Sequence, residues 1–64
     1  GKWEKVTIHF GADKGKLLGE LPPKKLGWWC NEWRPKPFGD RPIPEVDLLL
    51  RAALDVAAVE GLEK

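Results

Sequence analysis

The chain has 64 residues, 33% of them charged, and a formal net charge of only +1. This length allows one small domain, and no apolar stretch approaches the ~20 residues of a membrane span, so we expect no membrane association. The only cysteine, Cys30, excludes an internal disulfide framework and favours an intracellular, cytoplasmic protein. The first residue is not methionine, so we expect residues 1–64 to be one domain cut from a longer protein.

Charge is unevenly distributed along the chain. Residues 1–43 hold nine Lys or Arg against five Asp or Glu, whereas residues 44–64 hold two against five. This asymmetry indicates a basic surface for an anionic partner. An ordinary solvated surface explains so small an excess equally well.

Residues 4–10 have the pattern of a half-buried strand. Val6, Ile8 and Phe10 alternate with polar residues, which is typical of a strand with one face against a core. Gly11 and Gly15 suit a tight turn, because glycine adopts positive φ without steric cost. The pattern predicts a β-hairpin over residues 4–18.

Two helices are predicted beyond the hairpin. The first covers residues 23–33, because Pro23 suits the first helical position and Pro35 ends the helix. Residues 34–44 contain four prolines and a glycine, which predicts a stiff loop. The second helix covers residues 44–60, with acidic residues in its first turn.

The expected fold is therefore α+β: a β-hairpin packed on two α-helices (ββαα) in one small domain. The residues expected to form its core are Val6, Ile8, Phe10, Leu18, Leu21, Leu26, Trp29, Trp33, Leu50 and Leu54. Most positions between 46 and 59 are apolar, so the second helix carries more apolar surface than a small domain covers.

Three of the four tryptophans fall within residues 26–33. At 100° per residue, Trp29 and Trp33 lie beside Leu26 and Cys30 on one apolar stripe, which predicts a buried, slow-reacting Cys30 thiol. Trp28 falls between two lysines on the opposite side of the helix. It is either a ring that stacks on nucleic-acid bases or a core residue covered by another segment.

Catalytic and metal sites are not expected in this chain. One His and one Cys cannot supply a four-ligand zinc site, and Cys30 is predicted to be buried. Residues 11–17 depart from the phosphate-binding loop, because only three residues separate the glycines and Leu17 replaces Ser or Thr. We therefore expect no enzyme activity, no metal and no cofactor.

Residues 8–29 resemble the C-terminal domain of exodeoxyribonuclease X-like proteins, which is also appended to phage recombination proteins. The pattern is F-G-x-x-K-G-x-x-L-x-x-L-P-x-x-x-L-x-W, and the matching residues are Phe10, Gly11, Lys14, Gly15, Leu18, Leu21, Pro22, Leu26 and Trp28. The resemblance implies a non-catalytic accessory module of a nuclease or recombination protein that contacts DNA.

Together these observations predict weak binding of single-stranded or branched DNA, alongside contact with the rest of the parent protein. The candidate nucleic-acid-binding residues are Lys14, Lys16, Lys24, Lys25, Trp28, Arg34, Lys36, Phe38 and Arg41. Bases would stack on the rings of Trp28 or Phe38 while the cations contact phosphates. The alternative is a protein-interaction or dimerisation module that uses the apolar residues 46–59 of the second helix.

Overall fold

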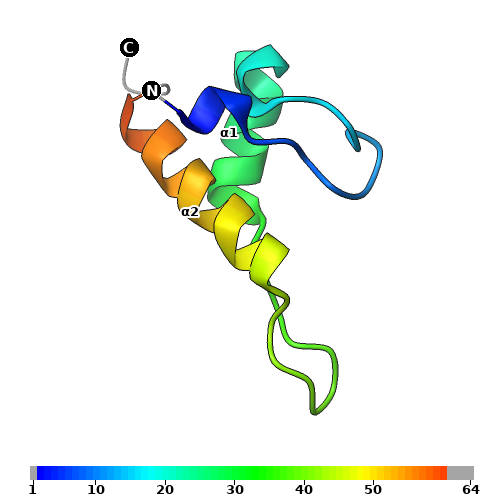
Figure 1. Cartoon of the computed structure of the whole chain (residues 1–64). Coiled ribbons are helices and arrows are strands. Elements are labelled where there is room, and N and C mark those ends of the chain that lie inside the picture. The colour runs from blue at the N-terminus through cyan, green and yellow to red at the C-terminus, as the bar shows by residue number, and fades with distance from the viewer. Residues whose placement is uncertain (1, 61–64) are drawn as a thin grey trace.

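The computed structural model describes residues 2–60 of the chain. In this range two α-helices, α1 (Pro23–Glu32) and α2 (Glu45–Glu60), pack against each other. Two short 3₁₀ helices, η1 (Trp3–Lys5) and η2 (Leu18–Glu20), lie against one another near them. Figure 1 shows the loop between α1 and α2 projecting at one end of the molecule, away from the loop that precedes α1.

The predicted β-hairpin over residues 4–18 is wrong, and with it the α+β (ββαα) class. The described residues contain no β-strand, and the two arms meet only at an isolated antiparallel bridge between Thr7 and Leu17. Ile8 N donates to Lys16 O at 2.9 Å, and Leu18 N donates to Val6 O at 2.9 Å. The residues therefore pair as predicted in direction, but over too short a length to form strands.

Both arms are cut short by the 3₁₀ helices at their outer ends. Residues 3–5 form η1 and residues 18–20 form η2, so the pairing ends where Leu18, the first residue of η2, donates to Val6 O. The two 3₁₀ helices touch at Gly19, where a Cβ atom would lie 2.7 Å from the Cβ of Glu4. The glycine permits this close approach, which replaces the strand pairing as the contact between the arms.

Both helices form where the sequence predicts them, within one residue at each end. Pro23 is in the first turn of α1, and Trp33, just past its end, has an extended backbone with φ −79° and ψ 128°. Pro44 precedes α2, and its carbonyl accepts hydrogen bonds from the amides of Asp47 (3.0 Å) and Leu48 (3.2 Å). These are the first bonds of a helix whose preceding residue has a suitable fixed φ.

The core lies between α1, α2 and the two 3₁₀ helices. Its buried members are Ile8, Leu18, Leu21, Leu26, Trp29, Cys30, Leu50, Ala53, Leu54 and Ala57. Three predicted core residues are less buried than expected: Val6 and Trp33 are half-buried, and Phe10 is 36% exposed. Phe10 follows the last paired residues, so the strand alternation that would have turned it inward no longer applies.

Cys30 is buried, as its place on the apolar stripe of α1 predicts. Its Sγ–H donates to the backbone carbonyl of Leu54 at 3.4 Å, across the contact between the two helices. Burial raises the pKa of the Cys30 thiol. The thiolate is the reactive form, so this cysteine is a packing residue rather than a nucleophile.

Candidate functional site

Asp13 holds the loop that precedes α1 against the helix. Its side chain is buried, unlike those of the other acidic residues that the structure describes. Oδ1 accepts a hydrogen bond from Lys25 Nζ at 2.9 Å, and Oδ2 accepts one from the indole Nε1–H of Trp29 at 3.2 Å. Lys16 Nζ lies 3.7 Å from the same Oδ1. One carboxylate thus joins residues of the loop to the first turn of α1 at Lys25 and to its second half at Trp29.

These contacts keep Asp13 ionised. The hydrogen bond from Lys25, and after it the one from Trp29, lower the pKa of the Asp13 carboxyl, although burial acts in the opposite direction. The charged form is satisfied by two donors and lies near two ammonium groups. The loop with Lys14 and Lys16 is therefore held in place by a charge that persists at neutral pH.

Trp28 is exposed, whereas its neighbour Trp29 is buried. The Trp28 side chain is 54% accessible, and its ring packs edge-on against Trp29 with centroids 5.3 Å apart and an interplanar angle of 89°. Trp29 is in turn held by Asp13. An aromatic ring is therefore presented to solvent in a defined orientation, which lowers the entropy cost of stacking a ligand on it.

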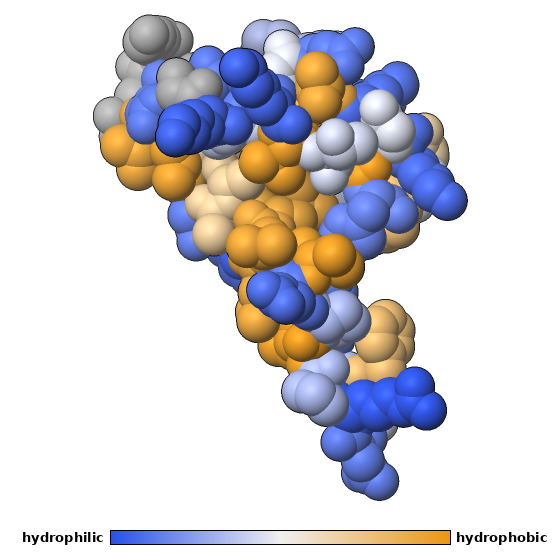
Figure 2. Space-filling model, viewed as in Figure 1, coloured by the Kyte–Doolittle hydropathy of each residue, from blue (hydrophilic) through white to orange (hydrophobic). Residues whose placement is uncertain are grey.

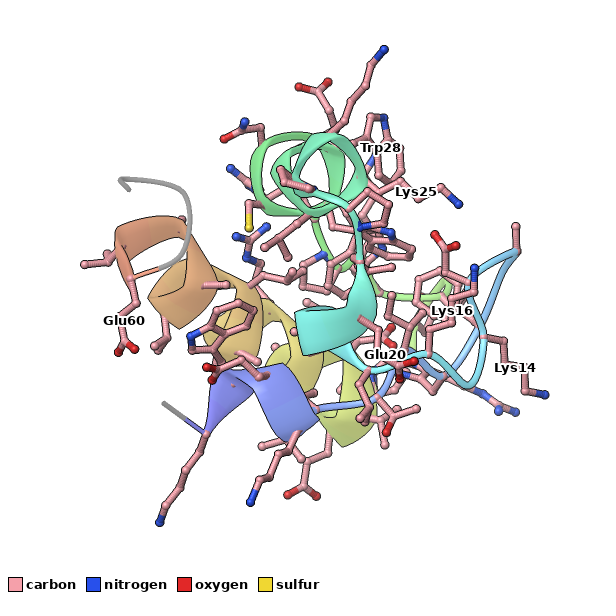
Figure 3. All side chains as sticks on the ribbon, turned by 90° about the horizontal axis from the view of Figure 1, so that it is seen from above. Lys14, Lys16, Glu20, Lys25, Trp28 and Glu60 are labelled. Atoms are coloured by element: carbon pink, nitrogen blue, oxygen red, sulfur yellow. The ribbon has the colours of Figure 1, made fainter. Side chains whose placement is uncertain are left out.

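Two lysines neighbour this ring on the helix, and two more lie on the preceding loop. Figure 3 shows Lys14, Lys16, Lys25 and Trp28 on the same side of the molecule, seen from above. Lys24 and Lys25 lie four and three residues before Trp28, so both are its neighbours on the helix surface. We call Lys14, Lys16, Lys24, Lys25 and Trp28 the tryptophan surface. Asp13 neutralises part of its charge, and Glu20 lies on the same side (Figure 3).

The other four predicted binding residues are on the loop between α1 and α2. They are Arg34, Lys36, Phe38 and Arg41, and all four are exposed. Phe38 and Arg41 begin and end the turn at the loop tip, where Arg41 N donates to Phe38 O at 3.1 Å and Gly39 has φ 61°. The structure thus divides the nine predicted residues into two groups, each with one exposed aromatic ring.

Two arginines hold the carboxyl end of α1. Arg51 of α2 donates from Nη1 to Trp33 O at 2.6 Å and from Nη2 to Cys30 O at 3.0 Å. Arg34 Nη1 donates to the same two carbonyls at 3.0 and 3.1 Å. Asp55, one turn along α2, accepts from Arg51 at 2.7 Å and orients it. The start of the proline-rich loop is therefore fixed relative to both helices.

A cavity of about 500 Å³ lies between this loop, the residues after the isolated bridge, and the start of α2. We call it the proline-loop pocket. Its lining comprises His9, Phe10, Trp33, Arg34, Pro35, Lys36, Pro37, Phe38, Pro44, Val46 and Asp47. At its wall His9 Nε2 donates to Asp47 Oδ1 at 2.6 Å, which joins the first loop to α2.

The face of α2 turned away from the core is apolar and exposed. Its large members, Leu48, Leu49, Val56 and Val59, are between 43% and 63% accessible, and Ala52 is also exposed. We call these five residues the outer stripe. Figure 2 shows hydrophobic atoms gathered along α2. A contiguous exposed apolar helix face on a small domain is a candidate interaction site.

No metal site is present in the part of the chain that the structure describes. Within residues 2–60, no three His, Cys, Asp or Glu side chains lie close enough together to hold an ion. Nor does any helix in this range have the length and apolar character needed to cross a membrane.

Sequence reasoning missed three groups that join separate segments of the molecule: Asp13, the His9–Asp47 pair and Arg51 as a helix cap. Asp13 lies in a Gly-rich turn, where an aspartate is ordinarily solvated, so nothing in the pattern pointed to its burial. Asp47, Arg51 and Asp55 are spaced by four along α2, a spacing that allows ion pairs, and the pair that forms is Arg51–Asp55. Asp47 pairs with His9 instead.

Comparison with known proteins adds no further constraint: no protein-family model, no curated protein and no solved structure matches the chain. The resemblance of residues 8–29 to the exodeoxyribonuclease X-like C-terminal domain therefore stays a prediction.

Proposed function

We propose that this domain is a non-catalytic accessory module that binds single-stranded or branched DNA through the tryptophan surface. It would act in the cytoplasm as part of a nuclease or recombination protein. The observation that carries the proposal is the 54% exposed ring of Trp28, held edge-on by Trp29 beside exposed lysines. Single-strand binding combines a ring on which bases stack with cations that follow the phosphates.

The packing around Trp28 supports a ligand role over a core role. A tryptophan is usually buried in a small domain, yet here neither α2 nor the proline-rich loop covers the ring. The Asp13 contacts bring Lys16 and Lys25 to one point beside α1. Two ammonium groups near one carboxylate leave a net positive charge, which favours a phosphate chain.

The binding is expected to be weak and dependent on salt. Non-specific affinities are typically about 10⁻⁴–10⁻⁶ M at physiological salt, and each phosphate contact on a single strand adds roughly 0.7 to the salt slope. Base stacking contributes about 1–3 kcal/mol per base and depends little on salt. Replacing the lysines should therefore change the salt dependence of binding, whereas replacing the tryptophan should change the affinity.

A titration of labelled single-stranded oligonucleotide at several salt concentrations tests the proposal. Lys24→Ala with Lys25→Ala should flatten the salt dependence, whereas Trp28→Ala should weaken binding by about 1–3 kcal/mol with little change in slope. Leu49→Ala, on the outer stripe, is the matched control, since it removes a similarly exposed apolar side chain elsewhere. Circular dichroism of each variant checks that the fold is retained. Absence of binding even at low salt would reject the DNA proposal.

The outer stripe favours a second candidate function, a protein-interaction or dimerisation module. Leu49 and Val59 are 60% and 63% exposed, and an apolar helix face of this kind docks on a partner helix or groove. Such docking would survive high salt, whereas phosphate contacts would not. Sedimentation of the domain at low and high salt, with Leu49→Asp as the disrupting variant, distinguishes self-association from DNA binding.

A further inference from the structure

The proline-loop pocket has the composition of a site for a flat ring joined to an anion. Three aromatic side chains from separate segments line it: Phe10 before α1, Trp33 at its end, and Phe38 in the proline-rich loop. Its volume of about 500 Å³ lies within the range of about 300–1,000 Å³ that is usual for small-ligand sites. The tryptophan surface, in contrast, presents a 54% exposed ring to solvent.

One aromatic wall of the pocket is rigid. Phe10 packs against Trp33 with centroids 5.7 Å apart and against Trp29 at 5.5 Å, so its ring is held by α1. The His9 ring also packs against Phe10, with centroids 4.9 Å apart, and His9 is itself held by Asp47. The wall is therefore formed before any ligand arrives, which lowers the cost of binding.

Phe38 faces the same cavity without such support. It is 69% exposed, and within the described residues its ring makes no contact with another aromatic ring. Two prolines, Pro35 and Pro37, precede it and limit the conformations of the loop. A large apolar side chain kept exposed on a stiff loop is positioned to cover a ligand in the cavity.

The charges around the pocket select an anionic ligand over a cationic one. Arg34 and Lys36 line it, whereas its carboxylate, Asp47, is already paired with His9. Arg34 uses Nη1 to hold the end of α1, and its Nε and Nη2 have no partner within the described residues. A fixed guanidinium with donors to spare is suited to a phosphate oxygen.

We propose that the proline-loop pocket receives one unstacked base of a single-stranded DNA, while Arg34 and Lys36 contact the phosphates on either side of it. The inference rests on the proposed function and extends it, because it assigns a second and sheltered base site. Phe10 and Trp33 form the wall against which the base lies, and Phe38 covers it. A strand would then engage the tryptophan surface and the pocket with different nucleotides.

Nuclear magnetic resonance of the ¹⁵N-labelled chain tests the assignment with two probes, octathymidylate and an abasic oligomer with the same number of phosphates. With octathymidylate, the Trp33 indole and the Phe38 amide should shift together with the Trp28 indole. The abasic oligomer should shift the lysine-rich residues and leave the Trp33 indole in place. Equal shifts at Trp33 with both probes would overturn the base site.

The same titration separates this inference from the proposed function. Shifts at Trp28 with none at Trp33 or Phe38 would overturn the pocket and leave the tryptophan surface intact. Absence of shifts at all three would overturn both. A proline-rich peptide that shifts the pocket resonances when octathymidylate does not would reassign the pocket to a protein ligand.

Affinity measurements provide the second readout. Phe38→Ala should weaken octathymidylate binding roughly 5- to 150-fold, the range expected for one stacked base, and Phe38→Trp should restore it. Phe38 is exposed, so neither variant should alter the fold. Leu49→Ala is again the matched control, since Leu49 is 60% exposed and lies on the outer stripe. An equal effect of Phe38→Ala and Leu49→Ala would overturn the proposal.

Discussion

The two ends of α1 are held by opposite charges. Toward the amino-terminal end, the carboxylate of Asp13 accepts from Lys25 in the first turn and also from Trp29 further along the helix, and so holds the preceding loop. At the carboxyl-terminal end, the guanidinium of Arg51 donates to Cys30 O and Trp33 O and holds the second helix. The positive charge of Arg51 at the carboxyl end of α1 is the sign that the helix dipole favours.

The two anchors differ in what depends on them. Asp13 fixes a surface loop that carries Lys14 and Lys16, and Trp29 beside it is also held by the core. Arg51 joins α1 to α2 across the contact that contains most of the core, and Arg34 duplicates both of its hydrogen bonds to α1. A chain this short buries few apolar side chains, so polar anchors specify how its segments meet.

The largest expected effect separates the two neighbouring tryptophans at the Asp13 end. Trp29→Ala should cost about 3–5 kcal/mol of unfolding free energy, because it leaves a large cavity and removes a donor from Asp13. A core of this size rarely supplies more than about 3–5 kcal/mol, so the variant should be largely unfolded at 25 °C. Trp28→Ala should cost at most about 1.5 kcal/mol, the value of its edge-on ring contact. Urea titrations followed by circular dichroism measure both. Equal losses would place Trp28 in the core.

A smaller effect is expected from the anchor at the other end. Arg51→Ala should reduce the free energy of unfolding by about 1.5–3 kcal/mol, because hydrogen bonds from a charged group to two carbonyls are lost. Arg34→Ala should cost less, since Arg34 is exposed. The double variant should lose more than the sum of the single variants, because each arginine still satisfies both carbonyls when the other is absent. Strict additivity in the double-mutant cycle would show that the two donors are independent.

The contribution of the Asp13 anchor to stability should depend on pH. Its carboxyl pKa is lowered from the usual value of 3.8, so its contribution to stability is complete above that pH and is lost as the pH falls through the lower folded-state value. Asp13→Asn should melt at a lower temperature than the wild type at pH 7, since an amide can offer its oxygen to only one of Lys25 and Trp29. The difference should shrink below about pH 4. Melting curves from pH 2 to 7 measure it, and a difference that is constant over this range would contradict the role of the charge.

Local signals in the sequence were sufficient for the helices and for most of the core. Pro23 and Pro35 bracket α1, and the spacing of Leu26, Trp29 and Cys30 identified its buried face. The alternation of Val6, Ile8 and Phe10 failed as a strand signal, because it did not include the 3₁₀ helices that end both arms. Ile8 is nonetheless fully buried. Of the three alternating residues, only Ile8 is fully buried, so the alternation identified one core side chain and no strand.

The candidate site was predictable in its members and not in its arrangement. The helical periodicity alone placed Trp28 opposite the apolar stripe, but whether another segment covers it depends on where α2 and the proline-rich loop lie. The division of the basic residues between the tryptophan surface and the proline-rich loop follows from the path of that loop (Figure 1). No pattern of neighbouring residues carries this information.

The sequence by itself therefore determined the two helices, their buried faces and the burial of Cys30, because these depend on residues within a few turns of one another. Only the tertiary structure decided that Asp13 is buried beneath Lys25, that His9 pairs with Asp47, and that Arg51 caps the other helix. Each of these contacts joins residues between 12 and 38 positions apart. A polar side chain in a turn or on a helix has many possible partners, and the packing of the apolar faces selects which of them comes within hydrogen-bonding distance.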